Sequence, residues 1–424
     1  MRVLTVTEQC NKPLEADYVS LLLGEERYAR RMSGRSDEEA VCFSINGKGD
    51  DYSVQSSYFV GVDRVNKDLA IQVLPKVQTG ESSIDYLEML VEALREPENS
   101  RFLSGLITVD FHAKPIELDQ KDDILSPFII AQFVMTLKNA VRKGLRKSYY
   151  LVTENMHSKV KGKILVEQNI RQNLLKRNYV DNVCRHQEYG VNNDENKILK
   201  KALDLAGKLL SSYHGQMKID ELKRTIARLK PYFREVDDDY DIDRVNSYNA
   251  NPIFKDYYSA LEYAILIIKR CSYGVGKNAD KLETTPPYWI DMSKLFELYV
   301  YKRLRELYGA GEVAYQKNIG GRYPDFLIRP QDGSDPYVVD AKYKLDYDKE
   351  FIIDDVRQVS AYARMKGVYY YFGMENRSLI RCLIVYPDLL ANDHFDGRFS
   401  NLDLEMSPTY EELYKVGIKL PVQH

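Results

Sequence analysis

The chain has 424 residues and a formal net charge of −3, with 44% hydrophobic and 29% charged residues. This length favours two or three globular domains, and the slightly negative charge excludes a generally basic nucleic-acid binder, so any such surface must be local. Five scattered cysteines without a CxxC pair argue against a zinc site and a disulfide framework, and no apolar run approaches the roughly 18 residues of a membrane span, so we expect a cytoplasmic protein without membrane contact.

Residues 1–110 are predicted to form an N-terminal domain that is mostly β. Short apolar runs at residues 58–62 and 69–75 lie between Gly, Asn, Asp and Ser, which are typical turn residues. A helix is expected over residues 84–94, because the apolar side chains there recur at helical spacing.

The middle region, residues 111–284, is predicted to be mainly helical. Helical periodicity is found over residues 129–142, 196–210, 219–229 and 257–271. Residues 278–287 are polar and end in Pro286-Pro287, which cannot continue a helix, so we expect a domain boundary there.

Residues 285–424 change to an αβββαβ order, which makes the whole chain an α+β or α/β multidomain protein. The expected elements are a helix at 291–307, strands at 313–319, 325–328 and 337–343, a helix at 352–365, and closing strands at 368–372 and 380–385. Glycines at 320–321 and 333 mark tight turns.

Two carboxylates and a lysine lie at the ends of two of these short strands. Asp325 opens the apolar run 326–328, and Asp340-Ala341-Lys342 closes the run 337–339. Carboxylates of this kind hold a hard divalent cation such as Mg²⁺, with Mn²⁺ as a substitute, and Lys342 can stabilise charge or orient the attacking water. The pattern indicates metal-assisted phosphodiester hydrolysis. The alternative is that both aspartates form turns and Lys342 is solvated.

The two flanking helices carry further polar side chains. Glu297 shares a helical face with apolar neighbours, which is costly unless a metal or a partner compensates for it, and a salt bridge at the rim is the alternative. On the second helix, Asp354 or Asp355, Gln358 and Tyr362 follow one another at successive turns. They form a polar stripe that either faces the site or is simply solvated.

The order of elements around Asp325 and Asp340-x-Lys342 resembles the PD-(D/E)xK nuclease superfamily over residues 291–390. This resemblance implies that Glu297 completes the metal site with the two aspartates. The spacing Gln358-x-x-x-Tyr362 resembles the Q-x-x-x-Y signature of RecB-like nucleases, where the pair helps to position the strand that is cut.

Several segments are similar to the McrC family, the nuclease subunit of McrBC-type systems that restrict DNA containing 5-methylcytosine. They are residues 143–145, 161–164, 194–200 and 291–297. The resemblance implies an AAA+ GTPase partner, a McrB-like ring whose hydrolysis the chain stimulates, and methylated double-stranded DNA as substrate. The regions before the nuclease domain would dock this partner. Residues 274–278 lack the pattern of a phosphate-binding Walker A loop, so the motor must be another chain.

Residues 138–186 carry twelve Lys and Arg residues against three acidic ones. This stretch is either a phosphate-binding track, a surface that meets the ring, or a solvated basic face. Arg142, Arg146 and Arg171 are the candidates for contacts with the partner or DNA.

The leading hypothesis is therefore a Mg²⁺-dependent DNA endonuclease subunit of a restriction complex that acts in anti-phage defence. One alternative is a nuclease of the same superfamily that works alone in DNA repair or processing. Another is an adaptor that activates an AAA+ ring and does not cut.

Overall fold

The computed structural model describes residues 1–22, 27–33, 39–49, 51–75, 83–96, 98–99, 102, 105–110, 113–118, 125–212, 220–239, 255–274, 283–344, 347, 351–374, 378–388 and 404–423. The chain divides into two compact units, and the first is discontinuous: it combines Met1–Asp119 with Thr284–His424, while Gln120–Glu283 form the second. The return to the first unit falls within the polar segment 278–287.

The N-terminal part of the first unit is built mainly from strands, as its turn-rich sequence predicts. Its elements are β1 (Arg2–Thr7), β2 (Asn11–Pro13), α1 (Ala16–Val19), β3 (Arg27–Ser33), β4 (Glu39–Lys48), β5 (Asp51–Ser56), β6 (Phe59–Arg64), β7 (Leu69–Leu74), β8 (Ser83–Ile84), α2 (Tyr86–Leu94), β9 (Ile107–Val109) and β10 (Ile116–Leu118). Strands β6 and β7 and helix α2 confirm the predictions made for this region. The sheets are β2-β5-β4-β3 and β1-β7-β6-β15-β9.

Strand β15 (Tyr288–Asp291) brings a later part of the chain into this N-terminal sheet, where it pairs with β6 and β9. Trp289 of β15 is 2% exposed and its ring stacks on that of Phe43, with centroids 5.8 Å apart. Burial of large aromatic side chains contributes strongly to core stability. The N-terminal sheets and the start of the C-terminal region therefore share one hydrophobic core.

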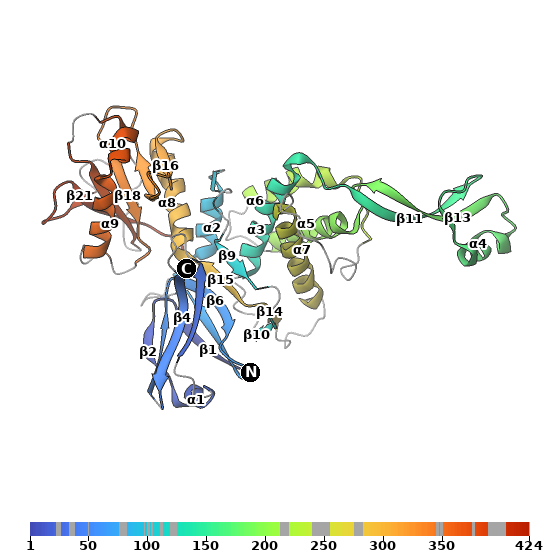
Figure 1. The fold of residues 1–424 in the computed structure, drawn as a ribbon, viewed down its shortest axis with the longest axis horizontal. Coiled ribbons are helices and arrows are strands. Elements are labelled where there is room, and N and C mark those ends of the chain that lie inside the picture. The colour runs from blue at the N-terminus through green and yellow to red at the C-terminus, as the bar shows by residue number, and fades with distance from the viewer. Residues whose placement is uncertain are drawn as a thin grey trace. The chain divides into compact units, whose positions relative to one another are not determined.

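The second unit contains the helices expected from periodicity and, in addition, a projecting β structure. Its elements are α3 (Leu125–Ala140), β11 (Ser148–His157), β12 (Lys163–Ile164), α4 (Val166–Gln172), β13 (Asp181–Gly190), α5 (Asp194–Ser212), α6 (Asp220–Leu229) and α7 (Lys255–Gly274). We call residues 148–190 the arm: a long antiparallel hairpin of β11 and β13 with α4 at its far end, which extends away from α3, α5 and α7 (Figure 1).

The arm was not predicted from the sequence. Pattern recognition relies on one buried face, but much of this hairpin is exposed on both faces, and apolar residues such as Tyr149 and Leu151 lie on its surface. The middle region is therefore less purely helical than predicted.

The C-terminal part of the first unit has a six-stranded mixed sheet between helices. Its elements are β14 (Glu283–Thr285), β15, α8 (Met292–Tyr308), β16 (Val313–Tyr315), β17 (Phe326–Ile328), β18 (Tyr337–Ala341), α9 (Ile353–Ala363), α10 (Lys366–Phe372), β19 (Arg381–Pro387), β20 (Glu405–Met406), β21 (Leu413–Ile418) and β22 (Val422–Gln423). The strand order is β16-β17-β18-β19-β21-β20, with β18, β19 and β21 parallel to one another. This confirms a mixed α+β architecture.

One predicted strand is wrong. Residues 368–372 form the end of helix α10, not a strand. The run of β-branched and aromatic residues favours a strand, but the side chains that are buried, Val368 and Phe372, are four residues apart, as on one face of a helix. Gly373 then ends the helix at a positive φ of 71°.

Within the part of the chain that is described, no helix is both long and apolar enough to cross a membrane.

Candidate active site

Alternation along β18 decides which side chains meet at the candidate site. Val338 belongs to the same hydrophobic cluster as Val356 and Val359 of α9, so this face of the sheet lies under α9. Because successive side chains of a strand point to opposite faces, Asp340 and, one step beyond the strand, Lys342 point to the same side. Asp340 is fully buried there.

Asp325 is joined to the same strand end. Its Oδ2 accepts a hydrogen bond of 2.9 Å from the backbone N–H of Ala341. The antiparallel register pairs Phe326 with Val339, which places Asp325 beside Asp340 across the β17–β18 pair. The fourteen residues between the two aspartates thus form a hairpin that brings the carboxylates together.

Lys342 is the centre of this cluster. Its Nζ lies 2.8 Å from Asp340 Oδ2, donates a 2.8 Å hydrogen bond to Gln358 Oε1, and lies 3.9 Å from Asp355 Oδ1. The Lys342 side chain is only 17% exposed, so the alternative of a solvated lysine does not describe this structure.

The charged groups of the cluster shift each other's pKa values. Burial raises the pKa of Asp325 well above its usual value, and the charges of Glu297 and Asp340 raise it further. Burial also raises the pKa of Asp340, although the Lys342 ammonium opposes this. Burial alone would lower the pKa of Lys342, but the charges of Asp340 and Asp325 outweigh it and hold that pKa above its usual value. Lys342 is therefore an ammonium at neutral pH.

Glu297 lies next to the pair of aspartates but is directed elsewhere. Its Oε2 accepts hydrogen bonds from Tyr315 Oη (2.9 Å) and Gln316 Nε2 (3.2 Å), at the end of β16. Its charge nevertheless acts on Asp325. Glu297 is thus a neighbour of the site whose side chain has other partners in this structure.

The residues present fit a hard divalent cation with few protein ligands. Both Asp340 oxygens are buried, and the Lys342 ammonium, 2.8 Å from Oδ2, is their charged neighbour. Asp325 supplies a second, partly buried carboxylate, whose Oδ2 accepts one backbone hydrogen bond. No group of three or more His, Cys, Asp or Glu side chains that could hold a metal ion is found among the described residues. Mg²⁺ commonly takes one or two carboxylates and completes its shell with water and substrate phosphate, so Asp325 and Asp340 suffice.

The polar stripe of α9 faces the site. Gln358 accepts from Lys342 and its Nε2 donates to Tyr362 Oη at 3.3 Å, so Lys342, Gln358 and Tyr362 form a chain of hydrogen bonds. The side chains on the other face of α9 are buried against the sheet. The stripe is therefore held against the cluster and not simply solvated.

Asp355 and Lys344 also belong to the cluster, although the sequence did not single them out clearly. Of the adjacent acids on α9, Asp355 is 6% exposed whereas Asp354 points outward with its side chain 86% exposed. Asp355 Oδ2 lies 2.6 Å from Lys344 Nζ. The helical phase of α9 could have chosen Asp355, because Val356 and Val359 fix which face is buried, but no local pattern marks Lys344.

The three basic candidates of the middle region do not form one site. Arg146 Nη1 lies 2.7 Å from Glu195 Oε1 and its guanidinium stacks over the Tyr258 ring, which is a structural role within the second unit. Arg142 is exposed near the end of α3, and Arg171 pairs with Glu167 on α4. Arg146 precedes the base of the arm and Arg171 belongs to its far end.

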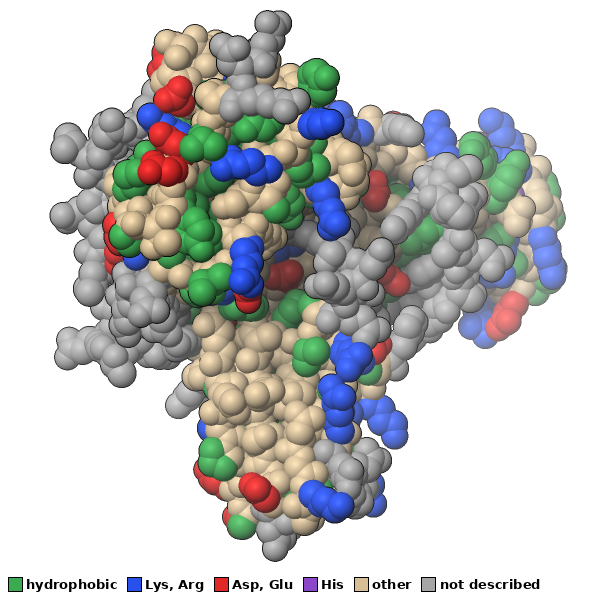
Figure 2. Space-filling model, turned by 60° about the vertical axis from the view of Figure 1, so that its left-hand side comes forward, with side chains coloured by type: hydrophobic (Ala, Val, Ile, Leu, Met, Phe, Trp, Pro, Cys, Tyr) green, Lys and Arg blue, Asp and Glu red, His purple; other side chains and the backbone are tan. Residues whose placement is uncertain are grey.

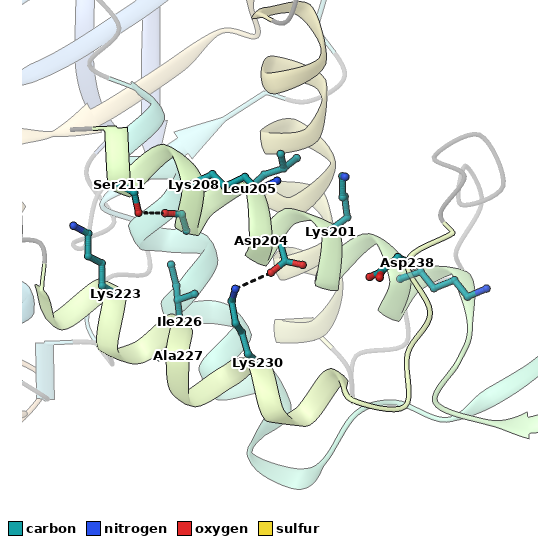
Figure 3. A pocket seen from close by; sticks show the side chains of 12 residues that line it. Lys201, Asp204, Leu205, Lys208, Ser211, Lys223, Ile226, Ala227, Lys230 and Asp238 are labelled. Carbon is teal, nitrogen blue, oxygen red and sulfur yellow. Dashed lines mark hydrogen bonds and ion pairs between the residues drawn. The ribbon is translucent and has the colours of Figure 1, made fainter. Parts of the chain in front are cut away.

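A groove of about 910 Å³ between α5, α6 and the turn that follows α6 was not anticipated from the sequence (Figure 3). Leu205, Ile226 and Ala227 are among its apolar lining residues, and Lys230 reaches across it to Asp204, with 2.9 Å between Nζ and Oδ1. Basic side chains dominate the lining: it includes Lys197, Lys201, Lys208, Lys223 and Lys230 against Asp204 and Asp238. We call it the lysine groove, and its charge suits an anionic ligand.

The arm exposes apolar side chains along its length. Tyr149, Leu151 and Tyr189 near its base are 71%, 65% and 63% exposed, and Leu175 and Tyr179 near its far end are 74% and 73% exposed. Figure 2 faces the first unit, where Lys and Arg side chains are spread among exposed hydrophobic ones. Exposed apolar groups of this density favour contact with a partner.

Fold and site together define an α+β protein with a largely buried Asp–Asp–Lys cluster at the ends of two strands of a mixed sheet. A family model described as "McrBC 5-methylcytosine restriction system component" matches residues 54–371. The chain belongs to this family, as its resemblance to the McrC family implied. No curated protein matches it significantly.

Two of the solved structures that are similar to this chain come from one organism. One is a half-complex from a tetradecameric assembly of Thermococcus gammatolerans McrB AAA+ hexamers with bound McrC, at 15% identity and a TM-score of 0.42 over 99% of this chain and 94% of that chain. The other is the McrBC complex of the same organism, at 16% identity and a TM-score of 0.29 over 72% of this chain and 87% of that chain.

Proposed function

We propose that this chain is the Mg²⁺-dependent DNA endonuclease subunit of a modification-dependent restriction complex, with a PD-(D/E)xK core. The observation that carries the proposal is the position of Lys342, which contacts Asp340 and Gln358 at 2.8 Å each, beside Asp325. Membership of the McrBC family supports the restriction context.

Each residue of the cluster has a role that follows from its contacts. Asp325 and Asp340 would hold the cation, which supplies activation of water and neutralisation of the phosphate charge when bound. Glu297 is the further carboxylate whose charge strengthens the attraction for a cation. The Lys342 ammonium stabilises the negative charge that develops on the phosphate as the bond breaks.

Gln358 and Tyr362 act on the position of Lys342. The amide oxygen of Gln358 holds the ammonium, while the amide nitrogen is fixed by Tyr362 Oη. A positioned group contributes more to the reaction than a mobile one, because the cost of ordering it has been met before the substrate arrives. The same exposed face of α9 is where the strand to be cut would lie.

The partner that we propose is a McrB-like AAA+ GTPase ring whose hydrolysis this chain stimulates. The arm is the surface best suited to it, since it projects and carries exposed apolar side chains beside basic ones such as Arg171 and Lys176. One of the similar solved structures is described as McrB AAA+ hexamers with bound McrC.

The substrate that we propose is methylated double-stranded DNA. The lysine groove of the second unit supports it, because basic side chains on both helices can neutralise backbone phosphates without reading sequence.

The function is tested with purified chain, Mg²⁺, and methylated or unmethylated plasmid, with and without a McrB-like GTPase and GTP. We expect cleavage only of methylated DNA, only with the GTPase and GTP, and none in EDTA. Robust cutting without any partner would instead support a stand-alone repair or processing nuclease. Faster GTP hydrolysis with no cutting would support an adaptor.

A further inference from the structure

The first strand of the chain ends against the candidate active site. Glu8 follows β1 directly and is fully buried. Its Oε1 accepts a 3.0 Å hydrogen bond from the phenol of Tyr343, the residue after Lys342, and the Tyr86 phenol lies 3.4 Å from the same oxygen. A contact thus joins residues that are 335 positions apart in the sequence.

A buried carboxylate costs free energy unless donors compensate for it. Two phenols meet this need here, and hydrogen bonds to an ionised acceptor are among the stronger ones in proteins. Both phenols have their pKa raised, first by burial and then by the charge of Glu8, so both remain donors. The carboxylate and Tyr343 are therefore held in one arrangement.

The neighbour of Glu8 holds the backbone at the same place. Gln9 Nε2 donates a 3.3 Å hydrogen bond to the carbonyl oxygen of Tyr343. The aromatic rings of Tyr58 and Phe296 pack on Tyr343, with centroids 6.5 Å and 5.7 Å away. Tyr343 is thus fixed through its side chain and its carbonyl by groups from the N-terminal region and α8.

This matters because the sheet no longer fixes the chain at this point. β18 ends at Ala341, and the last contact to the neighbouring strand is the 2.8 Å bond from Lys342 N–H to the Val385 carbonyl. The next backbone bond, from Lys344 N–H to the Lys342 carbonyl, is local. Beyond Lys342, the direction of the chain depends on what holds Tyr343 and, one residue further on, on the contact of Lys344 with Asp355.

We propose that Glu8 is a positioning residue of the active site, which acts through Tyr343 to orient Lys342 toward Asp340 and Gln358. This inference rests on the proposed nuclease function. It makes the start of the chain a part of the catalytic unit. Glu8 and Tyr343 themselves do not touch the reacting atoms.

The test uses the full-length chain with the variants Glu8→Ala, Glu8→Gln and Tyr343→Phe. Glu15→Gln is the matched control, since Glu15 is an exposed carboxylate of the same region. For each variant we would measure kcat and KM for DNA cleavage in the complex, thermal stability, and hydrogen exchange of the backbone at residues 342–344.

We expect Glu8→Ala and Tyr343→Phe to lower kcat by about tenfold or more with KM changed less than about twofold, because a small displacement of a catalytic group is costly. Exchange should rise at residues 342–344 and stay unchanged in β1 and β7. Glu8→Gln keeps an oxygen acceptor for Tyr343 and should recover part of the rate.

The inference would be overturned by an unchanged kcat in Glu8→Ala, or by exchange that rises throughout the N-terminal sheet together with a lower Tm, which is a purely structural effect. If the wild-type chain cuts no DNA, the proposed function fails, while the exchange at residues 342–344 still reports whether Glu8 fixes this segment.

Discussion

Lys342 Nζ donates a 2.8 Å hydrogen bond to Gln358 Oε1, so the end of β18 and the helix α9 share one contact at the candidate active site. The ammonium has Asp340 on one side and the amide of Gln358 on the other. The distance between strand and helix therefore determines where the positive charge lies.

Removal of the amide should impair the reaction more than binding. We expect Gln358→Ala to lower kcat by about 10–100-fold with little change in KM, since Lys342 loses its fixed partner. Single-turnover cleavage measures this. Arg357→Ala is the control, because Arg357 is the neighbour on α9 and is 75% exposed. Equal rates for Gln358→Ala and the control would show that the contact has no role.

Without a metal, the charged carboxylates of the site should lower the stability of the folded chain at neutral pH. The pKa of Asp325 is raised in the folded chain, so the fold holds its proton more tightly than the unfolded chain does. The contribution of Asp325 to the free energy of unfolding is then fully present below its unfolded pKa near 4, and it is lost as the pH rises through the higher pKa of the folded chain. At pH 7.5 in EDTA, Asp325→Asn should therefore raise Tm by a few degrees.

The same variant should lose its response to metal. Mg²⁺ or Mn²⁺ should raise the Tm of the wild type and leave Asp325→Asn unchanged, because a ligand stabilises only the state that binds it. Calorimetry at several metal concentrations checks this, with the exposed Asp354→Asn as control. A Tm of Asp325→Asn in EDTA below that of the wild type would contradict the electrostatic account.

Much of this site could be predicted from short-range sequence patterns. Asp325, Asp340 and Lys342 stand at the ends of short apolar runs, and the hairpin that joins them is contained within 20 residues. The helices α8 and α9 were predictable as well, because each has a periodic apolar face, and Asp291 caps α8 by accepting from the Lys294 N–H at 2.9 Å.

The rest depends on contacts that no local pattern contains. Glu8 meets Tyr343 only because β1 and β18 belong to one unit. The arm has no continuous buried face, so alternation was weak there, and residues 368–372 have strand-like composition but helical burial. The lysine groove needs the packing of α5 against α6 before its charges come together.

The lysine groove predicts a salt-dependent part of DNA binding. Lys208 and Lys223 are exposed and form no ion pair with a described residue. In Lys208→Ala/Lys223→Ala, the slope of log K against log salt for a DNA duplex should fall in magnitude by roughly one to two, since each phosphate contact contributes about 0.9.

Fluorescence anisotropy in Ca²⁺ measures this binding without cleavage. Lys12→Ala/Lys67→Ala removes two exposed lysines of the first unit and should keep the wild-type slope. An unchanged slope in the groove variant would place the phosphate contacts elsewhere. If Asp340→Asn bound the DNA duplex with wild-type affinity, the lysine groove and the candidate active site would be shown to act independently in binding.

The most direct test of the central claim is the rate at which Asp340→Asn cleaves methylated DNA in the complete complex with its GTPase and GTP. The substitution keeps the size of the side chain and removes the charge that Lys342 contacts and that would hold the proposed cation. We predict a loss of at least about 100-fold with unchanged stimulation of GTP hydrolysis, while the exposed Asp354→Asn keeps the wild-type rate. Cleavage by Asp340→Asn at the wild-type rate would contradict the assignment of this site.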